Sequence, residues 1–138
     1  MNYIRKLYVF LFLFSLIIFI GCATVQEGDK AAGKKAPYIV FTIPANGQTT
    51  VQRSGNFYVE IYFSAEMDPT TKEFFMMTTR GRRVEGRFFW LNGHTLQFRP
   101  DAVLEANATY ECRITDGYSI YKERLKDIPY LWLFVTGQ

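Results

Sequence analysis

The 138-residue chain contains few side chains suited to catalysis or to metal binding. His94 is its single histidine, and it follows an Asn-Gly turn with no second ligand nearby, so a zinc site is not expected. Ser54 and Ser64 have no neighbouring base that would activate a hydroxyl group for nucleophilic attack. The sequence therefore predicts neither enzymatic activity nor a bound cofactor.

Two carboxylates near the middle of the chain have the one spacing that suggests a cation. Glu66 and Asp68 lie two residues apart beside a proline, and with Asp101 or Asp116 they would begin a calcium site. The alternative is that Asp68 caps a turn by accepting hydrogen bonds from the backbone that follows it. So few oxygen ligands favour the turn, and we expect no metal site.

The two cysteines lie in different surroundings. Cys112 alternates with Glu111 and Arg113 in a segment of strand-like pattern, which favours a small core residue over a reactive thiol. Cys22 instead follows a long uncharged run near the N-terminus, directly after Gly21. Because Cys22 lies in a targeting segment, a disulfide between the two cysteines is not expected.

Residues 1–21 have the three parts of an export signal. Arg5 and Lys6 supply positive charge, and an uncharged run of 14 residues, 7–20, follows them. A membrane-spanning helix needs about 20 apolar residues, so this run is short for a permanent anchor. An ordinary signal peptide and an uncleaved anchor helix are the alternatives to a lipoprotein signal.

The end of this signal, 19–22 (FIGC), resembles the lipobox of bacterial lipoproteins, in which a lipid-modified cysteine becomes the new N-terminus. Phe19 departs from the leucine that is usual at its position. The resemblance implies that Cys22 carries the lipid, as palmitate or a similar acyl chain, and holds the protein on a membrane. Ala23 follows in place of aspartate, which favours the outer membrane if the source has one.

A short linker separates this anchor from the body of the chain. Residues 22–36 comprise the cysteine and a stretch of small and charged residues with no apolar period, which predicts a flexible linker. As a random coil it would span about 20 Å. Without Arg5 and Lys6 the chain keeps 14 basic and 13 acidic residues, so it has no basic face for nucleic acid.

From residue 37 to the end, short runs rich in β-branched and aromatic residues alternate with turn residues, which predicts an all-β sandwich of about seven strands. No window shows the apolar period of a helix, so helix is confined to one turn near 101–104. The expected strands are 38–43, 56–64, 74–79, 87–91, 95–99, 109–115 and 130–136.

Four short motifs occur in one order along this part of the chain: TIPANG at 42–47, FSAEMDP at 63–69, TLQFRP at 95–100 and WLFVTG at 132–137. In these motifs residues 37–137 resemble the bacterial Ig-like domain of SbsA-type S-layer proteins. The resemblance implies an Ig-like antiparallel β-sandwich for the domain 37–138. The loop 117–127 departs from the family pattern, so no function of that loop is carried over.

One hairpin has two possible registers around Asn92-Gly93. A two-residue turn there would place Phe89 and Leu91 on the core side. A bulge would place Phe88 and Trp90 there instead. The second register is favoured, because burying Trp90 contributes more than burying Leu91.

The last expected strand is apolar on both faces, which is unusual for a sandwich with a polar exterior. Trp132 and Phe134 share one face, and Leu131, Leu133 and Val135 share the other. Either the linker or the loop 117–127 covers the second face, or a partner binds there. The candidate partner surface consists of Leu131, Leu133, Val135, Tyr58 and Tyr62.

Together these patterns favour a membrane-anchored lipoprotein whose single Ig-like module acts in non-catalytic binding or adhesion at the cell envelope. Its partner would be an envelope protein or a glycan. The alternative is a structural or accessory subunit of an envelope complex, with no ligand of its own. Ig-like folds carry many unrelated functions, so the resemblance does not choose between the two.

Overall fold

The computed structural model describes residues 35–53 and 55–138. The predicted signal segment 1–21, the predicted lipidation site Cys22 and most of the predicted linker lie outside the described residues. Among the residues that are described, no helix is both long enough and apolar enough to cross a membrane.

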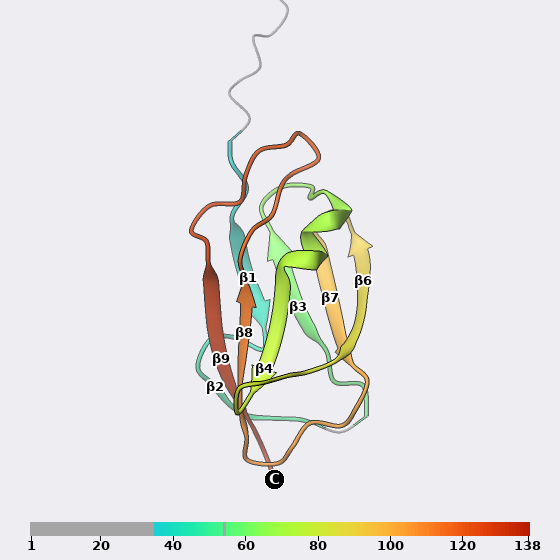
Figure 1. Ribbon diagram of the computed structural model, residues 1–138, viewed down its shortest axis with the longest axis vertical. Coiled ribbons are helices and arrows are strands. Elements are labelled where there is room, and N and C mark those ends of the chain that lie inside the picture. The colour runs from blue at the N-terminus through green and yellow to red at the C-terminus, as the bar shows by residue number, and fades with distance from the viewer. Residues whose placement is uncertain (1–34, 54) are drawn as a thin grey trace, which may run out of the picture. The chain divides into compact units, whose positions relative to one another are not determined.

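Two β-sheets pack face to face (Figure 1). Sheet I has the order β1-β3-β7-β6, made of β1 (Ile39–Ile43), β3 (Val59–Phe63), β7 (Thr95–Pro100) and β6 (Gly86–Asn92). Sheet II has the order β2-β9-β8-β4-β5, made of β2 (Gln48–Val51), β9 (Tyr130–Thr136), β8 (Thr109–Ile114), β4 (Phe75–Thr79) and β5 (Arg82–Arg83). Sheet I has the ABED order of an Ig sandwich and sheet II contains its CFG order, so the predicted fold class is confirmed.

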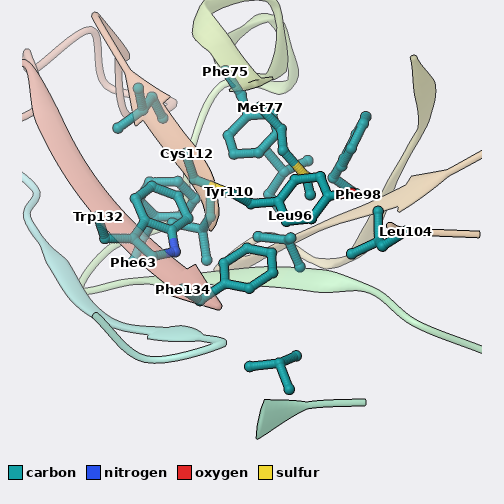
Figure 2. Packing of buried hydrophobic residues seen from close by; sticks show 14 of the residues in the cluster. Phe63, Phe75, Met77, Leu96, Phe98, Leu104, Tyr110, Cys112, Trp132 and Phe134 are labelled. Carbon is teal, nitrogen blue, oxygen red and sulfur yellow. The ribbon is translucent and has the colours of Figure 1, made fainter. Parts of the chain in front are cut away.

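The core lies between the sheets and is built by strict alternation along the strands. In β3, Val59, Ile61 and Phe63 point inward and are buried. In β9, Trp132 and Phe134 do the same. Figure 2 shows rings and aliphatic side chains from both sheets pointing toward one another. Burial of the large apolar side chains from both sheets is therefore what closes the sandwich.

Three elements differ from the sequence predictions. The expected helical turn near 101–104 is wrong, and the helix is instead a 3-10 helix, η1 (Pro69–Phe74). Asp68 caps it by accepting a hydrogen bond from the backbone nitrogen of Thr70 at 3.0 Å, and Pro69 presets the backbone of the first turn. The strands β2 and β5 were not expected, because they are short and polar.

The hairpin between β6 and β7 adopts the bulged register. Phe88 pairs with Phe98 and Trp90 with Leu96, but Asn92 then pairs with Thr95, so a residue is inserted between Trp90 and Asn92. Phe88 and Trp90 pack against the core, while Phe89 and Leu91 are exposed. The preference for burying Trp90 is confirmed.

A tyrosine corner joins the start of β8 to the loop before it. Tyr110 is buried, and its hydroxyl accepts a hydrogen bond from the backbone nitrogen of Glu105 at 2.8 Å. Tyr110 precedes Cys112 by two residues, which is the spacing of this motif in Ig domains. The bond ties the loop at 101–108 to the inner face of sheet II.

We predict that Tyr110→Phe lowers the free energy of unfolding by about 1–2 kcal/mol, because the Glu105 N–H loses its acceptor in a partly buried place. Urea unfolding measures the change. Tyr130→Phe is the control, since the Tyr130 hydroxyl has no hydrogen-bond partner in the described part of the chain. Equal effects of the two substitutions would contradict the role given to the Tyr110 hydroxyl.

Candidate binding surfaces

The side chains with catalytic potential do not converge. His94 is exposed in the β6–β7 turn. Cys112 is fully buried in the core, and burial raises the pKa of its thiol, so it stays protonated and inert. This confirms the expectation that Cys112 is a core residue. Ser54 lies outside the described residues.

Three of the four carboxylates of the possible calcium site, those other than Glu66, each pair with a different cation. Asp68 pairs with Lys122, Asp116 with Arg124 at 2.9 Å and Asp101 with Arg87 at 3.3 Å. The described residues hold no cluster of three metal-ligating side chains. These acids are therefore used as caps and ion pairs.

The loop 117–127 packs on one end of the sandwich. The backbone nitrogen of Ile120 donates to Glu66 O at 3.0 Å, and that of Lys126 donates to Pro37 O at 2.8 Å. Leu125 fills the space beneath the loop and is buried. The loop therefore closes the end at which the described chain begins (Figure 1), and it leaves β9 uncovered.

The outer side of β9 carries three of the five residues of the predicted partner surface. Leu131 is 47% exposed and Leu133 39% exposed, and Val135 is half-buried beside them. The register places Arg113 opposite Leu131 and Glu111 opposite Leu133 on β8. This strip is aliphatic along β9 and charged along β8.

The structure does not bring the predicted partner residues together. The outer side of sheet II carries Leu131, Leu133 and Val135. In sheet I, Tyr62 belongs to β3 and Tyr58 directly precedes that strand. The two sheets face each other through the core, so their outer sides point in opposite directions. The predicted surface is thus two separate surfaces.

The outer side of sheet I carries several exposed rings and aliphatic groups, which we name the aromatic face. Phe41 of β1 stacks on Tyr62 of β3 with ring centroids 4.0 Å apart, and Phe41 is still 47% exposed. Phe89 on β6 lies at the far side of the same sheet. The aromatic face consists of Phe41, Ile43, Tyr58, Tyr62, Phe89 and Leu91.

A strip of polar side chains lies beneath these rings. Glu60 and Gln97 are only 6% and 4% exposed, although both point to the outer side of sheet I. Gln97 Nε2 donates to Glu60 Oε1 at 2.7 Å, and Tyr62 Oη donates to Glu60 Oε2 at 2.6 Å. The bond to Glu60 raises the pKa of the Tyr62 hydroxyl, which keeps it a donor at neutral pH.

Arg99 extends the Glu60–Gln97 strip beyond Gln97. Its Nε donates to Gln97 Oε1 at 2.5 Å, and its guanidinium carbon lies 5.1 Å from the centroid of the Phe89 ring. The hydrogen bond and the ring contact together hold the guanidinium over the face of the Phe89 ring. Arg99 has no ion-pair partner among the described residues.

A hollow of about 520 Å³ adjoins the aromatic face at the end opposite the loop 117–127. Ile43 and Tyr58 border both features. The volume lies in the range of small-molecule and cofactor sites. The aromatic face therefore continues into a concave part of the surface.

Sequence reasoning found Tyr58 and Tyr62 but missed Phe41, Phe89 and the Glu60–Gln97–Arg99 strip. The alternation of β3 places Glu60 between the two tyrosines on one side, which was the available signal. Which strands lie beside β3 is a tertiary property, so the rest of the face was not readable from local pattern.

A family model for a bacterial Ig-like domain matches residues 33–136. The chain belongs to this family. The match confirms the resemblance noted in the sequence, and it concerns an Ig-like domain type that is itself non-catalytic. No curated protein matches the chain.

Several solved structures share the fold. The N-terminal part of the bacterial S-layer protein SbsC matches with a TM-score of 0.53 and 12% identity, over 74% of this chain and 24% of that one. An L,D-transpeptidase from Mycobacterium smegmatis matches with a TM-score of 0.54 and 16% identity, over 73% and 40%. L,D-transpeptidase 3 from Mycobacterium tuberculosis matches with a TM-score of 0.51 and 20% identity, over 72% and 37%. This Ig-like chain thus spans less than half of each neighbour, and identities this low establish the fold alone.

We predict that the Asp68–Lys122 pair stabilises the folded domain at neutral pH and that this stabilisation is lost at acid pH. The pKa of Asp68 is held below its usual value, first by the hydrogen bond from Lys122 and then by Thr70. A lowered folded-state pKa gives stability that is present above the unfolded value of about 4 and is lost as the pH falls through the folded value. Asp68→Asn should therefore destabilise at neutral pH, and its difference from the wild type should shrink on acidification.

Chemical unfolding at a series of pH values measures this difference. The difference in free energy of unfolding between wild type and Lys122→Gln should also shrink on acidification, because this substitution removes the main cause of the low pKa of Asp68. A gap between wild type and Asp68→Asn that stays constant from neutral to acid pH would contradict the assignment.

Proposed function

We propose that this protein is an envelope lipoprotein, held on a membrane by a lipid on Cys22, whose Ig-like domain acts in non-catalytic binding or adhesion. The observation that carries the proposal is the aromatic face, where exposed rings lie over an ordered polar strip. A solvent-facing sheet surface of this kind is unusual unless something binds it. The family and the S-layer neighbour support an envelope location.

The described geometry suits a domain that is held from one end. Lys35, the first described residue, lies at the end closed by the loop 117–127, and the hollow beside the aromatic face lies at the other end. A linker of about 20 Å would keep the domain close to the membrane with that hollow accessible. The outer membrane is favoured if the source has one, because Ala23 follows the cysteine.

The proposal that the chain is not an enzyme rests on its polar groups. Asp68, Asp101 and Asp116 are each ion-paired, the buried Cys112 thiol is protonated, and no base lies beside a nucleophile in the part of the chain that the structure describes. The transpeptidase neighbours are longer than this chain, and their activity is not carried over to it.

The outer side of β9 favours a second candidate, an accessory subunit of an envelope complex. Leu131 and Leu133 are exposed side by side along one strand, which suits contact with another protein. In this case the domain would be a structural part of the complex and would have no ligand of its own.

We predict that Cys22→Ala abolishes lipid attachment. Cells grown with a clickable fatty-acid analogue should label the wild type and not the variant, since the thiol is the acceptor. Cys112→Ala is the matched control and should label as the wild type does, because Cys112 is buried in the core. A Cys22→Ala protein that labels fully would contradict the anchor.

We predict that Leu133→Asp leaves the domain folded, because the side chain is exposed, and lowers the free energy of unfolding by about 1 kcal/mol, because the new carboxylate lies opposite Glu111. If the accessory role is correct, this variant also loses its protein adducts in whole-cell crosslinking followed by mass spectrometry. Val103→Asp, at an exposed site in the loop before β8, should keep them. Unchanged adducts in Leu133→Asp would exclude the β9 strip as the contact.

A further inference from the structure

The aromatic face combines three features that are seldom found together on one open sheet. Its rings are exposed, its central acid and amide are buried, and its cation is oriented by a hydrogen bond. Each feature has a separate consequence for the kind of molecule that fits there.

The exposed rings lie on both edge strands of sheet I. Phe41 is on β1 and Phe89 on β6, with β3 and β7 between them. The two edge strands lie roughly 14 Å apart, which is three strand spacings. The register also offsets Phe89 from Phe41 by two residues along the strands. Two flat apolar platforms this far apart suit an extended chain of rings that each have an apolar face better than one compact ligand.

The buried strip between the platforms holds Tyr62 in place. The Tyr62 hydroxyl donates to Glu60, which is only 6% exposed and also accepts from Gln97. Tyr62 itself is only half-buried, and its hydroxyl oxygen keeps acceptor sites that a ligand hydroxyl can use without rearrangement. A positioned acceptor suits a polyhydroxylated molecule, because each hydroxyl that leaves water needs a new partner.

Arg99 adds a positive charge that is already positioned. Its guanidinium lies on Phe89, bonds Gln97 through Nε and has no carboxylate partner among the described residues. A guanidinium prefers planar carboxylate or phosphate groups. Neighbouring Arg87 pairs with Asp101, so the accessible charge at this corner belongs to Arg99.

These contacts favour a sugar polymer over a protein partner. Protein hot spots lie in well-packed apolar pockets from which water is excluded. Here the rings lie on an open sheet face, and the exposed Arg99 and the half-buried Tyr62 place polar groups among them. The near balance of 14 basic and 13 acidic residues outside the signal segment also lacks the basic footprint that nucleic acid needs.

We propose that the aromatic face binds an acidic polysaccharide, with sugar rings stacked on Phe41 and Phe89, sugar hydroxyls bound to the Tyr62 hydroxyl and a carboxylate on Arg99. The proposal deepens the proposed binding function and rests on it for its place at the envelope.

Affinity electrophoresis of the full chain in detergent micelles tests the binding, with alginate as the polyuronate in the gel. The wild type should be retarded, and retardation should weaken on gels of the same polymer with its carboxylates reduced to alcohols. Phe41→Ala and Phe89→Ala should each weaken binding about fivefold or more, since each removes a stacking platform. Leu131→Ala, an equally exposed apolar side chain on sheet II, should bind as the wild type does.

Arg99→Gln separates the charge from the stacking. It should reduce binding to alginate about tenfold, equivalent to 1.4 kcal/mol, and leave binding to the carboxyl-reduced polymer unchanged. Circular dichroism and the urea midpoint report whether each variant is folded. If Phe41→Ala or Phe89→Ala does not fold, Arg99→Gln still tests the proposal.

Three outcomes would overturn the proposal. The first is no retardation of the wild type by either polymer, and the second is equal retardation of the wild type and of folded Phe41→Ala and Phe89→Ala. The third is that these two variants bind the polymer normally but lose a protein adduct in whole-cell crosslinking. Light scattering that shows a dimer lost in Phe41→Ala would assign the face to a second copy and overturn it as well. A chain that is lipidated at Cys22 and binds no polymer leaves the anchored role intact. A chain that binds the polymer without lipid contradicts the anchor alone.

Discussion

The ring contacts around Phe75 are the constraint on which the rest of the domain depends. The ring centroid of Phe75 on sheet II lies 5.2 Å from that of Phe98 and 5.8 Å from that of Phe88, both on sheet I. It lies 6.0 Å from the ring centroid of Trp132 on its own sheet. The described cysteine, Cys112, is free, so the sheets are joined by apolar burial and not by a disulfide across the sandwich. Because side chains alternate along a strand, fixing these rings inward also decides which residues point outward.

The outward surfaces follow from this inward choice. With Phe88 and Trp90 packed on the core, Phe89 is placed outside beside Arg99. With Ile61 and Phe63 buried, Glu60 and Tyr62 share the opposite side of β3, and Tyr62 meets Phe41 there. The same rule on β9 buries Trp132 and exposes Leu131 and Leu133. The alternation of side chains along the strands therefore determines both the core packing and the two candidate binding surfaces.

Local pattern predicted the elements in which alternation is strong. The run 130–136 matches β9, and burial of Trp90 predicted the bulge in β6. The short strands β2 and β5, with sequences QTTV and RR, carry no apolar alternation and could not be found in this way. The helix was predicted in the wrong place although Asp68-Pro69 is a recognisable start signal, because a 3-10 helix of only six residues needs no apolar period. The partner residues were joined into one surface because sequence shows which face a side chain takes but not which sheet its strand enters.

The proposed function combines a lipid anchor on Cys22 with a sugar-binding face on sheet I. Photocrosslinking in intact cells tests this combination, with a photoreactive phenylalanine analogue in place of Phe89 or, in a second strain, in place of Leu133. We expect carbohydrate-containing adducts in the membrane fraction from position 89 and none from position 133. Adducts with protein alone from position 89, or carbohydrate adducts from position 133 alone, would contradict it.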